Sequence, residues 1–101
     1  MSNVLSFDVL TAPARIVSDT RADFRKSAME YLERSAAAGA DTACIDLAAT
    51  EELDASGLGI LVLLQKRAHE MKLPVKLLNV PSNVRYLLVL TKLDHLFAMG
   101  R

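Results

Sequence analysis

The sequence predicts an α/β fold, because strand-like and helix-like segments alternate along its 101 residues. Apolar runs at 42–47 and 75–80 have the length and composition of buried strands. Between them, a strongly apolar segment of helical length occupies 56–71. This strand–helix–strand order is typical of a sheet with helices packed against it.

Four segments are predicted to be strands. The first, 4–10, alternates only weakly between apolar and polar residues, which favours an edge position. A short second strand covers 14–17, after a turn at Pro13. The third, 42–47, carries few polar residues and is expected at the centre of the sheet, and 75–80 is the fourth.

Three segments are predicted to be helices. The first starts at a capping pattern of Thr20 and Asp23 and ends at Gly39. The second, 56–71, is apolar on all sides in its first half, which is therefore either buried or partly exposed to a partner. The third follows a turn at 81–83. The expected inward faces are Phe24, Ala28, Tyr31 and Leu32 in the first helix and Val84, Leu87, Leu88 and Thr91 in the third.

Composition and charge indicate one globular domain over residues 1–101, with no nucleic acid partner and no membrane insertion. Twelve basic residues balance twelve acidic ones, and no basic cluster contains interleaved aromatic residues. No apolar run reaches the about 18 residues that a membrane span requires. The lone Cys44 cannot form an internal disulfide, so we expect a buried thiol in a reducing compartment, the cytoplasm.

Catalytic and metal-binding patterns are missing from the sequence. Gly57 and Gly59 lack the Gly-Lys-Ser/Thr of a phosphate loop, and Ser56 does not lie in the Gly-x-Ser-x-Gly pattern of a serine hydrolase. Neither His69 nor His95 has a second ligand at metal-binding spacing. We expect no enzymatic activity, no cofactor and no metal.

A candidate site lies where an acidic turn meets the apolar helix, in Glu51-Glu52-Leu53-Asp54-Ala55-Ser56-Gly57-Leu58-Gly59. Ser56 could cap this helix by accepting a hydrogen bond from a free N–H group of the first turn. Alternatively, the positive end of the helix dipole and the free N–H groups suit a phosphate on Ser56.

This stretch resembles the signature of bacterial STAS domains, specifically the anti-sigma factor antagonists. The resemblance rests on Asp46-Leu47 and on 53–61, where an aspartate and a small residue precede Ser-Gly-Leu-Gly, and it continues through 74–80 to Phe97. It implies the STAS fold, an α/β architecture with a small mixed four-stranded sheet and helices packed mainly on one face. The sequence departs from the family at 14–17, where the usual Gly-x-Leu-Asp is replaced by Ala-Arg-Ile-Val.

By this resemblance, Ser56 is a phosphoacceptor in a partner-switching regulator. The implied partners are an anti-sigma factor that is also a serine kinase of the histidine-kinase-like ATPase type, and a PP2C-type phosphatase. ATP would belong to the kinase. The residues expected to bind the partner are Asp54, Ala55, Ser56, Gly57, Leu58, Ile60 and Leu63. Two alternatives remain: a constitutive STAS subunit of a transport complex such as a lipid-transport ATPase, in which Ser56 only caps the helix, and a scaffold in a signalling assembly.

Overall fold

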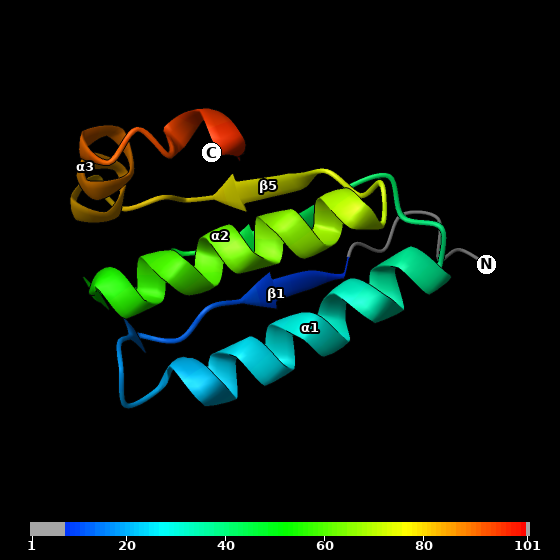
Figure 1. Cartoon of the computed structure of the whole chain (residues 1–101), viewed down its shortest axis with the longest axis horizontal. Coiled ribbons are helices and arrows are strands. Elements are labelled where there is room, and N and C mark those ends of the chain that lie inside the picture. The colour runs from blue at the N-terminus through cyan, green and yellow to red at the C-terminus, as the bar shows by residue number, and fades with distance from the viewer. Residues whose placement is uncertain (1–7, 101) are drawn as a thin grey trace.

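The computed structural model of the chain describes residues 8–100, in which strands and helices alternate (Figure 1). In chain order, the elements are β1 (Val9–Thr11), β2 (Arg15–Ile16), α1 (Arg21–Ala37), β3 (Ala43–Asp46), β4 (Glu52–Leu53), α2 (Ala55–Glu70), β5 (Val75–Leu78), α3 (Ser82–Leu90), the 3₁₀ helix η2 (Asp94–Leu96) and β6 (Ala98–Gly100). The predicted α/β fold class is confirmed. Residues 4–7 of the first predicted strand lie outside the described residues.

The main sheet has four strands in the order β1-β3-β5-β6. Each of its described strand pairings is parallel, whereas the resemblance implied a sheet with both parallel and antiparallel strands. As predicted, β1 lies at an edge and β3 at the centre. The predicted strand at 14–17 is not part of this sheet, because β2 pairs with β4 in a separate two-stranded sheet. The fourth strand of the main sheet is β6, which the sequence analysis did not predict.

One face of the main sheet carries the core. Along β3, Ala43 and Ile45 are buried while Cys44 and Asp46 are only partly so, and β5 repeats this alternation. Figure 1 shows α1 and α2 side by side over the same face of the sheet, which confirms the expectation of helices packed mainly on one face. Cys44 points to the opposite face and is half-buried, so the expectation of a buried thiol is wrong.

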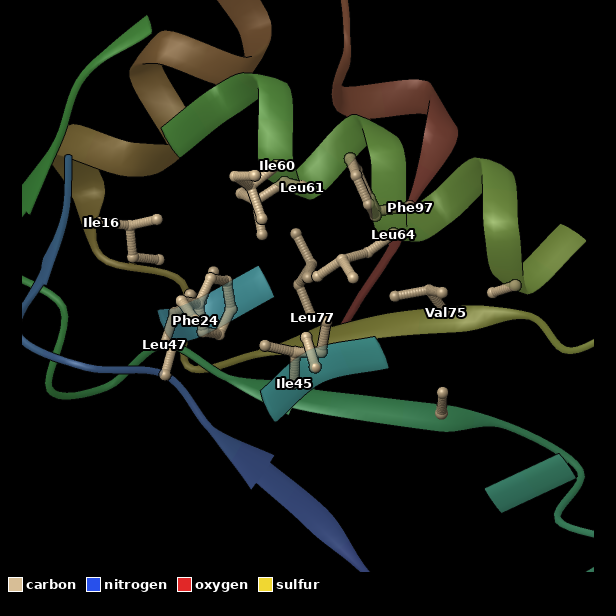
Figure 2. Close-up of a cluster of buried hydrophobic side chains, with 14 of the residues drawn as sticks. Ile16, Phe24, Ile45, Leu47, Ile60, Leu61, Leu64, Val75, Leu77 and Phe97 are labelled. Atoms are coloured by element: carbon tan, nitrogen blue, oxygen red, sulfur yellow. The ribbon is translucent and has the colours of Figure 1, made fainter. Parts of the chain in front are cut away.

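Apolar side chains from α2 fill the space above the sheet. Leu61 and Leu64 are fully buried and face Ile45 and Leu77 of the central strands (Figure 2). Each fully buried leucine stabilises the fold by about 1.5–3 kcal/mol relative to an exposed one. Phe97 closes the same core from the C-terminal end of the chain.

The predicted ends of α1 are partly confirmed. Gly39 follows the helix with a φ of +76°, a conformation that glycine adopts without strain. Thr20 precedes the helix as predicted, but its hydroxyl does not cap it. The Thr20 hydroxyl instead donates to the Arg15 carbonyl oxygen at 2.8 Å and accepts from the Val17 N–H at 3.0 Å. Thr20 therefore shapes the segment between β2 and α1.

The buried Tyr31 of α1 joins the two neighbouring strands β1 and β3. Its hydroxyl donates to the Asp8 carbonyl oxygen just before β1 and accepts from the Cys44 N–H in β3, both at 2.8 Å. Burial raises the pKa of this phenol above its usual value. Because the hydroxyl has a partner on each side, α1 is anchored to the sheet by polar as well as apolar contacts.

Membrane crossing by a helix is not seen in the part of the chain that the structure describes, because none of its helices combines the necessary length with the necessary apolar character.

Candidate functional site at the start of α2

The candidate site lies at the carboxyl end of the sheet. The strands in Figure 1 point to the end of the molecule at which α2 begins, and the chain reaches α2 from the end of β3. Sites in open α/β sheets commonly lie beyond the carboxyl ends of the strands. Ser56 is the second residue of α2 and is half-buried there.

Asp54, rather than Ser56, caps α2. Asp54 has extended backbone geometry, and its Oδ1 accepts a hydrogen bond from the Gly57 N–H at 2.9 Å. This is the bond that an N-cap side chain makes to the first turn of a helix. The interpretation of Ser56 as the helix cap is therefore wrong, and its hydroxyl is left without a capping role.

The second carboxylate oxygen of Asp54 reaches another part of the chain. Its Oδ2 accepts a hydrogen bond from the Ser18 N–H at 3.2 Å, in the segment between β2 and α1. The bond from the Gly57 N–H is the main reason that the pKa of Asp54 is lowered. Desolvation opposes this effect, and the N–H groups of Ser18 and Ser56 lower the pKa further by smaller amounts. Asp54 is therefore a carboxylate at neutral pH that fastens the start of α2 to the neighbouring segment.

Gly57 permits a close approach between α2 and β2. It is buried, and a Cβ atom at this position would overlap the carbonyl oxygen of Ile16. A backbone carbonyl cannot move aside as a flexible side chain can. Gly57 therefore lets the start of α2 lie against β2. Because Gly57 is buried, the expectation that it contacts a partner is corrected.

Gly59 has a different environment from Gly57. It is exposed, and a Cβ atom there would meet nothing within 4 Å. Gly59 and Leu63 lie three and seven positions after Ser56, so the three residues share one side of the helix. The missing side chain at Gly59 leaves this side of the helix open one turn after Ser56.

The other residues expected to bind a partner divide into accessible and buried groups. Asp54 and Ala55 are exposed, and Leu58 and Leu63 are half-buried. Ile60 is only 7% exposed and points into the core (Figure 2), so its assignment to the docking surface is corrected. The helix is apolar on several sides, and packing against the sheet selects the side that includes Ile60.

Residues 13–15 support the loop before α2, although the sequence did not predict this contact. The N–H groups of Glu51 and Glu52 both donate to the Ala14 carbonyl oxygen, at 2.7 and 3.1 Å. The buried Thr50 donates from its hydroxyl to the Pro13 carbonyl oxygen at 2.9 Å. Arg15 and Glu52 add an exposed ion pair at 2.9 Å. Residues 13–15 therefore support the site, and two of them belong to the 14–17 stretch in which the sequence departs from the resemblance.

The N-terminal end of α3 also contacts this loop. The side-chain amide of Asn83 donates to the Glu51 carbonyl oxygen at 3.1 Å. The sequence indicated only a helix-starting turn at this position. No local pattern could have paired Asn83 with a residue 32 positions earlier.

The described residues form no candidate metal site near Ser56, and their main surface hollow lies away from it. Within residues 8–100, His, Cys, Asp and Glu side chains do not gather in threes at distances that could hold a metal ion. The exposed His69 and His95 line a surface hollow of about 800 Å³ near the C-terminal end of α2, with Leu73 and Phe97 among its apolar residues. This hollow is at the other end of the helix from Ser56.

Comparisons with known proteins agree with this architecture. A family model described as Mlab, STAS domain, matches residues 8–99 of the chain. No curated protein sequence gives a significant match. Among solved structures, a candidate anti-sigma factor antagonist from Thermotoga maritima superposes with a TM-score of 0.73, covering 95% of this chain and 85% of that one at 18% identity. The structural likeness shows a shared fold, and the family match over nearly all of the sequence shows that this chain belongs to the STAS domain family.

Proposed function

We propose that the chain is a partner-switching regulator of the anti-sigma factor antagonist type, acting in the cytoplasm. The unphosphorylated form would bind an anti-sigma factor that is also a serine kinase, of the histidine-kinase-like ATPase type. Phosphorylation of Ser56 would release it, and a PP2C-type phosphatase would restore binding. The kinase would supply the ATP, and this chain would act as its substrate and not as an enzyme.

One observation carries this proposal. Asp54 makes the capping bond to the Gly57 N–H, so the Ser56 hydroxyl is not required to start the helix. Ser56 is half-buried at the start of α2, and the exposed Gly59 one turn later leaves that side of the helix without a side chain. A half-buried serine that is not needed to cap its helix suits an acceptor that a kinase must reach. The likeness to the Thermotoga maritima protein supports the same class of function.

The docking surface that we propose consists of the accessible residues around Ser56. It includes Asp54, Ala55 and Leu63, with Glu51 and Glu52 on the adjoining loop, and it extends to the half-buried Leu58, which also packs against the core. Ile60 and Gly57 would act from beneath by fixing the position of the helix. Leu58 and Leu63 would be the apolar part of the interface. Glu51 and Asp54 would make the adjoining edge negative, since Glu52 is paired with Arg15.

Phosphorylation would change the charge of this surface. A phosphate adds about −1.5 to −2 charges beside a carboxylate that already occupies the N–H groups at the start of α2. The phosphate and Asp54 would then compete for the same positive end of the helix. A partner pocket shaped around a neutral hydroxyl would meet extra bulk and repulsion, and a buried unpaired charge there costs several kcal/mol.

Calorimetric titration of the purified anti-sigma factor with three forms of the chain tests the proposal. Wild type and Ser56→Ala should bind alike, and Ser56→Ala should resist phosphorylation. Ser56→Asp should bind about tenfold or more weakly, because an aspartate imitates only part of the phosphate charge. Circular dichroism should give one fold for all three. Equal affinity for the three forms would reject the switch.

A second candidate function is a constitutive STAS subunit of a transport complex, such as a lipid-transport ATPase. Hydrogen bonds of Asp54, Thr50 and Asn83 hold the loop at 50–54 in place. A loop with a fixed conformation is suited to permanent docking, which favours this second function. A pull-down from the native cell separates the two, since a kinase-type anti-sigma factor and a transport ATPase are different proteins. In the transport case, Ser56→Asp would not control association.

A further inference from the structure

The outer face of α3 carries an uncovered apolar stripe, formed by Tyr86, Val89 and Leu90. These side chains are 65%, 54% and 62% exposed, and they are the large apolar side chains left exposed among the described residues. Their spacing of three and four positions places them on one side of the helix. Val84 and Leu88 on the opposite side are buried and already attach α3 to the core. The stripe is therefore not needed for packing within the chain.

The stripe begins next to the candidate site. Asn83, which binds the Glu51 carbonyl oxygen, lies three positions before Tyr86 on the same helix. Figure 1 shows α3 at the end of the molecule where α2 starts. A protein that contacts the loop at 51–56 therefore also comes close to the start of α3.

The size of the stripe indicates a part of an interface and not a whole one. A helix of nine residues is only about 14 Å long, and three side chains on it fall well short of the about 800 Å² per partner that a stable interface buries. A second copy docked through α3 alone would lack the necessary area. Together with the surface around Ser56, the stripe gives one larger composite surface.

The charge around the stripe defines the chemistry of the partner. Arg85 is the one charged residue of α3, whereas Glu51 and Asp54 on the adjoining loop are acidic and Glu52 there is paired with Arg15. A complementary surface would present an apolar groove to Tyr86 and Leu90, with basic groups beside it facing the acidic loop.

We propose that the protein that docks on the Ser56 surface also covers the α3 stripe, and that the stripe supplies a part of the binding that does not depend on phosphorylation. This proposal rests on the proposed function. The stripe holds the partner through apolar contact, and the charge state of Ser56 controls the other half of the interface. Substitutions in the two halves act separately, because they change different contacts.

The experiment titrates the purified anti-sigma factor, from the organism that makes this chain, with a set of variants. Leu90→Arg places a charge in the stripe, and Tyr86→Ala removes apolar area without adding charge. Ala37→Arg is the matched control, since Ala37 is an exposed helical residue at the far end of α1. Thermal unfolding checks that each variant keeps the fold, which the exposure of these positions leads us to expect.

Leu90→Arg and Tyr86→Ala should each weaken binding about tenfold or more, whereas Ala37→Arg should bind like wild type. Combining Leu90→Arg with Ser56→Asp should multiply the two losses.

Wild-type affinity in both stripe variants would overturn the proposal. Sedimentation that shows a dimer of this chain, which Leu90→Arg dissociates, would also overturn it. Loss of binding in the stripe variants but not in Ser56→Asp would reject the switch and leave the stripe standing. An anti-sigma factor that does not bind wild type would reject both.

Discussion

The Asp54 carboxylate accepts a hydrogen bond from the Ser18 N–H at 3.2 Å, across 36 positions of sequence. Its other oxygen caps α2 through the Gly57 N–H. One side chain therefore sets both the start of the helix and its attachment to the segment between β2 and α1. This arrangement makes the ionisation of Asp54 a determinant of how firmly the candidate site is held.

Asp54 should make the stability of the protein depend on pH in the acid range. The folded state lowers the pKa of Asp54, so its contribution is fully present above about pH 4, the unfolded value, and is lost as the pH falls through the folded pKa. Asp54→Asn should lower Tm at neutral pH by several degrees and should flatten the acid part of a plot of Tm against pH. The exposed Asp41, replaced by Asn, is the control. The same acid profile in Asp54→Asn and wild type would contradict this prediction.

The two glycines of the motif should respond in opposite ways to alanine. Gly57→Ala forces a Cβ atom against the Ile16 carbonyl and should lower the free energy of unfolding by about 2–3 kcal/mol. Gly59→Ala meets open space on an exposed helix and should raise it by about 0.5–1 kcal/mol. Urea unfolding measures both. A destabilised Gly59→Ala would mean that the space at Gly59 is not open.

Gly59→Ala also separates stability from function. The variant should be at least as stable as wild type, so any loss of affinity for the anti-sigma factor comes from the interface and not from the fold. A partner that approaches closely beside Ser56 would lose affinity, whereas a partner that docks only on α3 would not.

Tyr31 should stabilise the sheet through its hydroxyl. Tyr31→Phe leaves the Cys44 N–H without its partner and should lower the free energy of unfolding by about 1–2 kcal/mol. The folded state raises the pKa of Tyr31, so stability should also fall as the pH rises above about 10, where the unfolded phenol ionises first. Tyr31→Phe should reduce the loss of stability above about pH 10. Tyr86→Phe, which removes an exposed hydroxyl, should change neither the free energy of unfolding at neutral pH nor its decrease at alkaline pH.

Periodicity predicted those elements that bury an apolar face. The helix with Phe24, Ala28, Tyr31 and Leu32 was predicted correctly, as were β3 and β5, because each carries its signal within a few residues. The short strands β4 and β6 were missed. Glu52–Leu53 is a strand only because it pairs with a segment 37 positions earlier, and Ala98–Gly100 contains no β-branched residue. Such elements depend on tertiary contacts.

The errors at the site have a similar origin. Asp and Ser are equally good N-caps, so the sequence could not decide between Asp54 and Ser56, which lie two positions apart. The apolar first half of α2 gave no preferred side, so the burial of Ile60 had to come from the packing of α2 against the sheet. Ser18, Asn83 and the 13–17 segment join the site through hydrogen bonds to distant residues.

Phosphorylation of Ser56 should loosen the bond between Asp54 and Ser18. The phosphate would lie at the same helix end as the carboxylate, and repulsion between them should draw Asp54 away from the N–H groups of Ser18 and Gly57. Amide hydrogen exchange at these two positions should therefore become faster in the phosphorylated chain.

Leu73 provides an internal reference for that measurement. Its N–H binds the Ala68 carbonyl oxygen at 2.8 Å at the far end of α2, so its exchange should not change when Ser56 is phosphorylated. Ser56→Ala should exchange like wild type at Ser18, and Ser56→Asp should lie between wild type and the phosphorylated form. If exchange at Ser18 were the same in all forms, Asp54 would keep its bonds beside the phosphate. The effect of phosphorylation would then act only on the partner interface, because the loop itself would be unchanged.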